Sequence, residues 1–503
     1  MSPLPALDFE HWGHALAQRH RAVLAHGPGD VHLLLAEQSP GPLLLQAVQA
    51  RLQAPVQWQA CDAATLDSCL AQGGQAFRAL HGVQATADDG AEDLAGGAES
   101  AVHELSSALM AGQASPAVRL LDAVLHDALL DGASDVHLET DARGAQVRLR
   151  IDGVMQPLRR VDGVALAEQM VSRLKVMAEL DIGERRLPQD GRFKLRVAGR
   201  EIDFRLSVMP SIEGEDAVVR VLDRAALEHQ PAAVAGHLTL QALGFGDVQR
   251  AQIAALARRP HGMLLVTGPT GSGKTTTLYA ALAETHTGQD KLITIEDPVE
   301  YRLPGAVQIP VNEKKGLSFA RGLRSILRHD PDRVLVGEIR DSETAQIAVQ
   351  AALTGHLVFS TVHANSAFDV IGRFMHMGLD LYNTVSALNA VLAQRLLRQL
   401  CEHCKRVAPG HDLGHELGHA APVMQAVGCP QCRGTGYRGR RAVAELLCLD
   451  DELRDMIAAR APMLHIKQRA RAQGLRPLQD AAQDAVQAGW TTPEEVARVT
   501  AGA

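Results

Sequence analysis

The segment from residue 268 to residue 275 reads GPTGSGKT, and it constrains this chain more than any other feature. It matches every position of the phosphate-binding pattern G-x-x-x-x-G-K-[ST], and it follows the apolar run MLLVT, which ends at Thr267. Glycines let the backbone curl so that successive N–H groups face one anion, and the helix that follows adds its positive N-terminal end. A chance Gly-rich turn would not be flanked by a strand pattern and a helix pattern in this order. We therefore predict that the chain binds a nucleoside triphosphate.

ATP with Mg²⁺ is the expected ligand of this loop. Lys274 is predicted to reach the β- and γ-phosphates, and the hydroxyl of Thr275 is predicted to face Mg²⁺. The predicted nucleotide-binding residues are Gly268, Pro269, Thr270, Gly271, Ser272, Gly273, Lys274, Thr275 and Thr276.

Size and composition indicate a multidomain protein that has no general attraction to polyanions. A chain of 503 residues allows about three domains. Its net charge of −8 and its 3% aromatic content argue against nucleic acid as the main substrate. No apolar run approaches the ~20 residues of a membrane-spanning helix, and the N-terminus lacks a basic start before an apolar core. We expect a cytoplasmic protein that reaches a membrane only through its partners.

Changes in composition along the chain predict three domains. Residues 84–100 are small and acidic without apolar periodicity, which is typical of a flexible linker. A helical pattern and several arginine-rich strand patterns follow, with turn signals at Asp152-Gly153, Asp190-Gly191 and Ala198-Gly199. The assigned ranges are 1–83 for a small α/β domain, 84–112 for the linker, 113–235 for an α+β domain and 236–503 for the nucleotide-binding domain.

The last domain alternates short apolar runs with helical stretches. The runs are MLLVT, KLITIE, RVLVGE and HLVFSTVH. This pattern is typical of a parallel sheet with helices on both faces, so we predict an α/β, RecA-like fold with the phosphate loop at the end of one strand.

Acidic residues follow two of these predicted strands. Glu338 and Asp341 come directly after RVLV, where a carboxylate can reach the Mg²⁺ shell or a water in line with the γ-phosphate. An acidic residue at such a junction can instead begin a helix, which weakens the argument for Asp341 more than that for Glu338.

Glu296, Asp297 and Glu300 form a second acidic cluster after KLITI. Several carboxylates repel one another unless a cation or an attacking water lies between them, which phosphoryl transfer requires. We therefore expect both acidic strand ends to converge on the nucleotide.

Three further groups of residues are candidates. His356 and His363 flank a predicted strand and serve either nucleotide sensing or interior hydrogen bonding, two uses between which the sequence does not decide. Arg205 and Arg220 lie on strands of the second domain, where arginines normally face solvent, although an arginine from a second domain or subunit can neutralise charge in the transition state.

The cysteines, the third group, are spaced for a metal rather than for disulfides. Cys401, Cys404, Cys429 and Cys432 form two C-x-x-C pairs, a spacing that suits tetrahedral Zn²⁺ and leaves no position open for a reacting water. We expect a structural zinc site in a subdomain at about residues 398–440. Cys61 and Cys69 are expected to be isolated structural thiols.

Taken in order, these motifs resemble the secretion ATPase superfamily, and most closely the type II secretion and type IV pilus assembly ATPases. The segments that carry the resemblance are ASDVHLE (133–139), RLPQDGR (186–192), GPTGSGKT, ITIEDPVEY, VGEIRD, TGHLVFSTVHAN and the two C-x-x-C pairs. The resemblance is dense from about residue 115 to residue 503 and looser over the first eighty residues.

The resemblance implies a hexamer in which a PAS-like second domain and the RecA-like domain clamp ATP, and in which hydrolysis moves an inner-membrane platform protein. Residues 1–80 would bind a recruiting protein of the cytoplasmic membrane, so that the chain is attached peripherally. The implied site residues are an Asp box of Glu296, Asp297 and Glu300, a Walker B glutamate at Glu338, a His box of His356 and His363, and arginine fingers at Arg205 and Arg220.

The expected function is therefore ATP hydrolysis that powers pseudopilus assembly for type II protein secretion, with Glu338 as the preferred catalytic base and Glu296 as a further catalytic residue. Extension of a type IV pilus is the alternative closest to it. The negative net charge argues against a nucleic-acid motor, and Glu338 argues against a scaffold that binds ATP without hydrolysing it.

Overall fold

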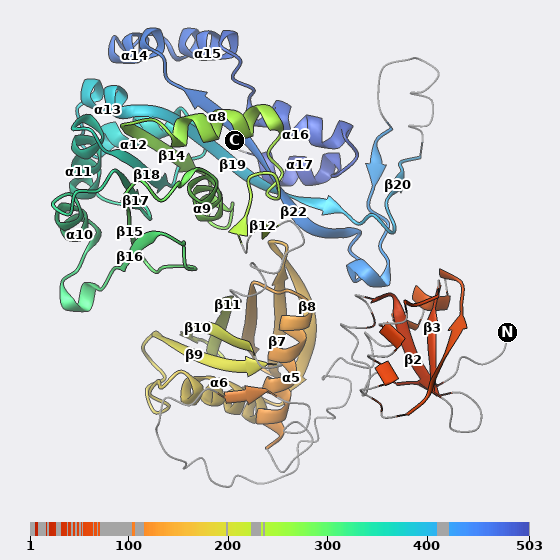
Figure 1. The fold of residues 1–503 in the computed structure, drawn as a ribbon. Coiled ribbons are helices and arrows are strands. Elements are labelled where there is room, and N and C mark those ends of the chain that lie inside the picture. The colour runs from red at the N-terminus through yellow and green to blue at the C-terminus, as the bar shows by residue number, and fades with distance from the viewer. Residues whose placement is uncertain are drawn as a thin grey trace. The chain divides into compact units, whose positions relative to one another are not determined.

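The structure is a computed structural model, and its residues form two compact units, Met1–Leu222 and Asp223–Ala503 (Figure 1). It describes residues 115–222 except 198–199, residues 239–409, residues 422–501, parts of residues 6–70, and three short strands at 103–105, 233–234 and 237–238. The segment predicted as a flexible linker, 84–100, lies outside the described residues. Strand β5 (His103–Leu105) falls within the wider linker range of 84–112 and pairs with the sheet of the second domain.

A four-stranded sheet lies near the N-terminus. Its strands β1 (Ala6–Leu7), β2 (Ala22–His26) and β3 (His32–Ala36) are antiparallel neighbours, and β4 (Val56–Ala60) runs parallel to β3. Leu24, Leu34 and Leu66 are fully buried in its core, so this region has an apolar centre of its own.

A seven-stranded sheet follows, in the order β5-β9-β10-β11-β6-β7-β8. Two helices, α5 and α6, pack against one face of it and share its apolar core. The elements are α5 (Pro116–Leu130), β6 (Asp135–Asp141), β7 (Gly144–Ile151), β8 (Val154–Asp162), α6 (Val164–Met177), β9 (Gln189–Val197), β10 (Arg200–Ser211) and β11 (Gly214–Leu222).

Two of the predicted turns in this region have different outcomes. Asp152 and Gly153 have φ angles of 49° and 82° and join β7 to β8, as a two-residue hairpin turn requires. The turn predicted at Asp190-Gly191 is wrong, because both residues lie inside β9. A Cβ atom on Gly191 would lie 2.8 Å from the carbonyl oxygen of Ala178, so this glycine permits close backbone approach instead of a turn. The Ala198-Gly199 turn lies outside the described residues.

The second unit is built on another seven-stranded sheet, in the order β16-β15-β17-β18-β14-β19-β22. All neighbouring strands are parallel except β19 and β22. This confirms the predicted α/β fold with a parallel sheet. The strands are β14 (Gly262–Thr267), β15 (Leu292–Glu296), β16 (Ala306–Pro310), β17 (Arg333–Val336), β18 (Leu357–Val362), β19 (Leu388–Leu400) and β22 (Tyr437–Cys448).

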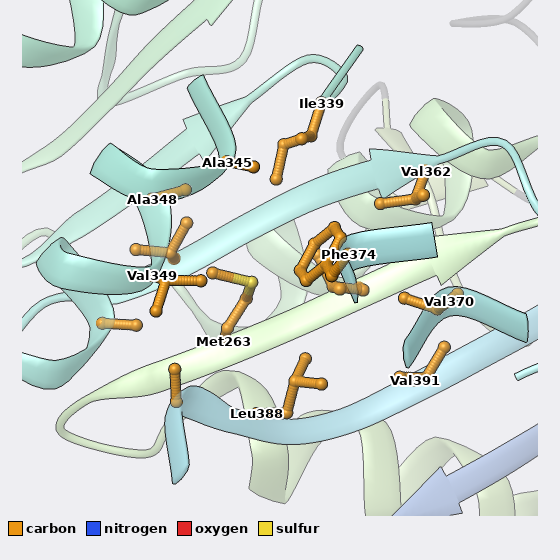
Figure 2. Close-up of a cluster of buried hydrophobic side chains, with 14 of the residues drawn as sticks. Met263, Ile339, Ala345, Ala348, Val349, Val362, Val370, Phe374, Leu388 and Val391 are labelled. Carbon is orange, nitrogen blue, oxygen red and sulfur yellow. The ribbon is translucent and has the colours of Figure 1, made fainter. Parts of the chain in front are cut away.

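Helices cover both faces of this sheet, which explains why its strands read as continuous apolar runs. Met263 of β14 points toward Val349 and Phe374 on one face (Figure 2), and Leu264 belongs to the separate core on the other face. The helices of the first face are α10 (Phe319–Ile326), α11 (Ser342–Leu353), α12 (Asp369–His376) and α13 (Leu381–Ala387), and those of the second are α8 (Asp247–Ala257) and α9 (Lys274–Thr285).

Short strands, two 3-10 turns and four C-terminal helices complete the described part of the second unit. The two-stranded sheets are β12 (Ala233–Val234) with β13 (His237–Leu238) and β20 (Arg406–Val407) with β21 (Met424–Gln425), and 3-10 turns occur at Glu313–Lys315 and Pro430–Cys432. The helices are α14 (Asp451–Ala458), α15 (Met463–Ala472), α16 (Leu478–Gln487) and α17 (Pro493–Thr500). Within the part of the chain that the structure describes, no helix has the length and apolarity needed to cross a membrane.

Candidate nucleotide site

The parallel strands bring the sequence motifs to one edge of the sheet. The phosphate loop, the acidic cluster that begins at Glu296, Glu338 and His363 lie at the carboxyl ends of β14, β15, β17 and β18, respectively. In open α/β sheets this edge is where ligands bind. The predicted convergence of these motifs on one edge is therefore a direct result of the topology.

The phosphate loop has the backbone that its glycines were expected to provide. Gly268, Gly271 and Gly273 have φ angles of 146°, 76° and 80°, and Gly273 is the N-cap of α9. The N-terminal end of α9 therefore points its free N–H groups into the loop, which makes this position suited to an anion.

Lys274 begins α9 and is only 9% exposed. Its ammonium group donates to the carbonyl oxygens of Gly268 and Pro269, at 2.9 Å and 3.0 Å. Burial lowers the pKa of Lys274, and the charge of Glu338 opposes this shift. The lysine is thus held over the loop, close to the carboxylate of Glu338, which follows β17, two strands away from β14 in the sheet.

Glu338 is held by two cationic or polar partners. Arg340 donates to its Oε1 at 2.5 Å, and Nε2 of His363 lies 3.4 Å from its Oε2. Burial alone would raise the pKa of Glu338, but Arg340 and His363 outweigh burial and lower it. The side chain is 18% exposed, so Glu338 is an ionised carboxylate that solvent still reaches.

The two histidines lie at opposite ends of β18. His363 follows the strand and contacts Glu338, and burial together with Lys274 lowers its pKa. His356 precedes the strand, and its Nδ1 is 3.1 Å from the carbonyl oxygen of Ala351. Six strand residues separate them, or about 20 Å. Within one chain, the structure therefore brings His363 to the phosphate edge and leaves His356 at the other edge, in an interior hydrogen bond.

Glu296 ends β15 but lies inside the protein, only 2% exposed. The hydroxyl of Tyr279 donates to its Oε2, Thr294 donates to its Oε1 at 2.6 Å, and Gln308 donates to its Oε1 at 3.2 Å. Burial and the neighbouring Glu296 raise the pKa of Tyr279. Both oxygens of Glu296 thus have protein donors.

The other acidic candidates differ in their surroundings. Asp297 and Glu300 are exposed, and Asp297 is close enough to Arg340 to raise the pKa of that arginine, although Glu338 has the larger effect. Asp341 is the N-cap of α11, because its carboxylate accepts from the N–H and the hydroxyl of Thr344 at 2.8 Å and 2.9 Å. The helix-start interpretation therefore accounts for Asp341.

The structure adds a pair of residues that the sequence did not single out. Gln394 and Arg395 of β19 contact the phosphate loop and the segment after β18. Their stretch, LNAVLAQRLLRQL, carries no loop motif. It also lacks the alternation of apolar and polar residues that marks a half-exposed strand, because its first eight residues are all buried. A polar pair within an apolar run was the signal available to find them.

Arg205 and Arg220 lie directly opposite each other on β10 and β11. Arg220 donates to Asp135 at 2.9 Å, and its side chain is 55% exposed. The neighbours of Arg205 on β10, Phe204 and Leu206, are buried in the core that α5 and α6 share. Because side chains alternate between the two faces of a strand, both arginines belong to the face that these helices do not cover.

The four cysteines predicted to bind a metal lie together. Their sulfur atoms all lie within 4.8 Å of one another, with three separations of 3.7–3.8 Å. A tetrahedral Zn²⁺ with Zn–S bonds of ~2.3 Å requires sulfur atoms about 3.8 Å apart, so the donor set fits zinc. The N–H groups of Cys429 and Gly436 also donate to Cys432, as thiolate ligands require.

Comparison with known proteins identifies the family. The family described as "Type II/IV secretion system protein" matches residues 111–498. The chain is 41% identical over 497 residues to the type II secretion system protein HxcR of Pseudomonas aeruginosa, which covers 97% of this chain and 98% of that protein. It is 45% identical over 395 residues to the type II secretion system ATPase E of Vibrio cholerae, which covers 77% and 76% of the two chains.

A solved structure shows the same fold at lower similarity. The ATPase DotB of Legionella pneumophila is 19% identical, with a TM-score of 0.57, over 80% of this chain and all of that chain. The predicted resemblance to the type II secretion and pilus assembly ATPases, and with it the prediction of an ATP hydrolase, is confirmed by these matches. This chain belongs to the type II/IV secretion system protein family.

Proposed function

We propose that this chain is the motor ATPase of a type II secretion machine and that its hydrolysis of ATP powers pseudopilus assembly. The relatives named above are a type II secretion protein and a type II secretion ATPase, which favours this machine over an extending pilus. The observation that carries the proposal is the meeting of Lys274, Glu338 and His363 beside a phosphate loop with an open helix N-terminus.

The loop binds the triphosphate tail in this proposal. Its N–H groups and the N-terminal end of α9 face the phosphates, and Lys274 exchanges its two carbonyl acceptors for the β- and γ-oxygens. When Mg²⁺ is bound with ATP, with Thr275 as the residue to hold it, the ion neutralises phosphate charge.

Glu338 is assigned as the general base. It is ionised, partly solvated, and close to Lys274, so it can orient a water and accept its proton. The water oxygen bonds to the γ-phosphorus as the bond to the β–γ bridging oxygen breaks, leaving ADP and phosphate. His363 holds the second oxygen of Glu338 and is assigned as the sensor of the γ-phosphate.

Glu296 is assigned to position the site, because each of its oxygens is already occupied by buried donors. Asp297 and Glu300 extend the acidic cluster toward Arg340 and Tyr301. Arg205 and Arg220 are proposed as arginine fingers that neutralise charge in the transition state, since a guanidinium in this role is worth several powers of ten in rate. His356 is assigned a structural role.

We also propose the assembly that the family resemblance implies. The chain would act as a hexamer in the cytoplasm, with residues 1–83 as the partner-binding domain and 113–235 as the PAS-like domain. The partners would be an inner-membrane platform protein and a recruiting protein of that membrane, bound through residues 1–80. Cys401, Cys404, Cys429 and Cys432 would hold a structural Zn²⁺ that fixes the subdomain at about 398–440.

The test of the nucleotide assignment is the Lys274→Ala variant of the full chain. We expect wild-type protein to release phosphate from Mg-ATP, and the variant to lose measurable turnover and at least about tenfold in ATP affinity by calorimetry, because a charge-assisted contact to the phosphates is gone. Wild-type protein without turnover, or a variant with unchanged affinity and rate, would end the proposal.

The zinc assignment has a separate test. We expect wild-type protein to carry about one zinc per chain by elemental analysis, and Cys404→Ser to lose it, because a four-thiolate site closes only with all its ligands. Cys448→Ser is the matched control, since this thiol lies at the end of β22 and is absent from the cluster. Equal zinc content in both variants would contradict the assignment.

A further inference from the structure

We infer that Gln394 and Arg395, consecutive residues of β19, are positioning residues with separate duties: Gln394 fixes the phosphate loop for ATP binding, and Arg395 fixes the segment that carries His363 for hydrolysis. The inference rests on the proposed function, because it assigns roles within the same site. It follows from the register of β19, in which Ala393 is the partner of Thr267, the last residue before the loop.

Gln394 joins both sides of the turn from loop to helix. Its Nε2 donates to the carbonyl oxygen of Ser272 at 2.7 Å, and its Oε1 accepts from the hydroxyl of Thr277 at 2.8 Å. A carbonyl only accepts, so these two partners also fix the orientation of the amide. Gln394 is 1% exposed, so water cannot replace either bond.

Two of the loop glycines are packed against the same residue. A Cβ atom on Gly268 would lie 2.5 Å from the carbonyl oxygen of Gln394, and one on Gly273 would lie 3.1 Å from its Nε2. The loop backbone therefore rests on Gln394 at both of its ends. The side chain and the backbone carbonyl of Gln394 therefore support the loop conformation in which the N–H groups face a phosphate.

Arg395 bonds to a different segment, and its guanidinium also lies beside the loop: a Cβ atom on Gly268 would lie 3.3 Å from its Nη1, and its charge contributes to the lowered pKa of Lys274, after the larger effect of burial. It is 6% exposed, its Nη2 donates to the carbonyl oxygen of Asn365 at 2.9 Å, and its Nη1 donates to that of Gln394 at 3.1 Å. Asn365 lies two residues after His363. The guanidinium thereby sets the path of the backbone that presents His363 to Glu338.

The two duties are separable because the side-chain hydrogen bonds go to different segments: those of Gln394 to the loop and to α9, and that of Arg395 Nη2 to Asn365. Loss of Gln394 loosens a loop that contacts phosphate in the ground state and in the transition state alike, which weakens binding with little effect on kcat. Loss of Arg395 displaces His363 and Glu338, which act on the attacking water, and shifts of about 1 Å in such groups can cost up to about 10²-fold in rate.

The first experiment compares Gln394→Met with Gln399→Met in the full chain. Gln399 lies further along β19 and is the matched control. We expect Gln394→Met to raise the Kd for Mg-ATP about tenfold by calorimetry, with kcat changed less than about twofold. Hydrogen exchange of residues 268–275 should speed up in this variant alone.

The second experiment uses Arg395→Met and the conservative Arg395→Lys. We expect Arg395→Met to lower kcat by about 10- to 100-fold while the Kd for Mg-ATP stays within about threefold. Arg395→Lys should recover part of kcat, since an ammonium reaches one of the two carbonyls, and it supplies the measurement if Arg395→Met does not fold.

The outcomes separate this inference from the proposed function. If wild-type protein turns over ATP but Gln394→Met binds it normally, or if both variants lower affinity and kcat in the same proportion, the assignment of separate duties is overturned. If wild-type protein shows no turnover, the proposed function fails instead.

Discussion

Glu296 ends β15, and Glu338 lies two residues after the end of the adjacent parallel strand β17, yet their environments are opposite. Glu296 is buried and accepts hydrogen bonds from Tyr279, Thr294 and Gln308. Glu338 is partly exposed, and its partners are Arg340 and His363, both of which solvent reaches.

The difference teaches that position at a strand end does not by itself give a carboxylate a catalytic role. A base needs a free lone pair and solvent access, which Glu338 has. A carboxylate whose oxygens are filled by buried donors instead stabilises the strand ends, which is the arrangement of Glu296. The comparison predicts that replacing Glu338 mainly lowers activity, whereas replacing Glu296 mainly lowers stability.

The largest effect is expected for Glu338→Gln. We expect kcat to fall by about 10²- to 10⁴-fold because the amide cannot accept the proton of the attacking water. ATP binding and the thermal midpoint should stay near those of wild-type protein, since a partly exposed ion pair contributes at most about 1 kcal/mol. Phosphate release and calorimetry on the same preparation check this, and a variant that keeps normal turnover would break the comparison.

Glu296→Leu should show the reverse pattern. It leaves buried donors on Thr294 and Tyr279 without an acceptor, at a cost of about 3 kcal/mol, or roughly 6–10 °C in the thermal midpoint. Tyr279→Phe is the matched control: it removes one donor and keeps the edge contact with Tyr301, so its cost should be about 1 kcal/mol. Equal midpoints for Glu296→Leu and Glu338→Gln would refute the structural role.

The smallest effect is a shift in pH dependence in Arg340→Ala. Arg340 and His363 lower the pKa of Glu338 against the effect of burial. When Arg340 is removed, the effect of burial is less opposed. The pKa of Glu338 therefore rises, and its carboxylate becomes protonated at a higher pH. We expect the acid limb of kcat/KM to move to higher pH, whereas Arg250→Ala, which removes an ion pair on α8, should leave it in place. An unmoved limb would mean that Glu338 is not the titrating base.

The sequence predicted the parallel sheet and the residues that meet at its edge, because the phosphate loop and the acidic clusters follow apolar runs of strand length. It did not distinguish Glu296 from Glu338, since burial depends on Tyr279 and Gln308, which are distant in sequence. It predicted that His356 and His363 flank a strand, but it did not decide between nucleotide sensing and interior hydrogen bonding for either of them. Position along a strand was predictable, but tertiary partners were not.

Strand β19 was the main omission for a physical reason. Leucine, alanine, glutamine and arginine are good helix formers, but pairing with β14 and β22 overrides that preference. Gly191 is a similar case: the sequence cannot distinguish a glycine that serves a turn from one that admits a neighbouring backbone.

The course of β19 has a mechanical consequence. The strand touches the nucleotide loop through Gln394 and ends at Leu400, one residue before the first cysteine of the thiol cluster. Six residues of extended chain span about 20 Å and cannot lengthen, since a strand is already near its full reach. We therefore expect a displacement of the loop along the axis of β19 to be transmitted to the first cysteine of the thiol cluster.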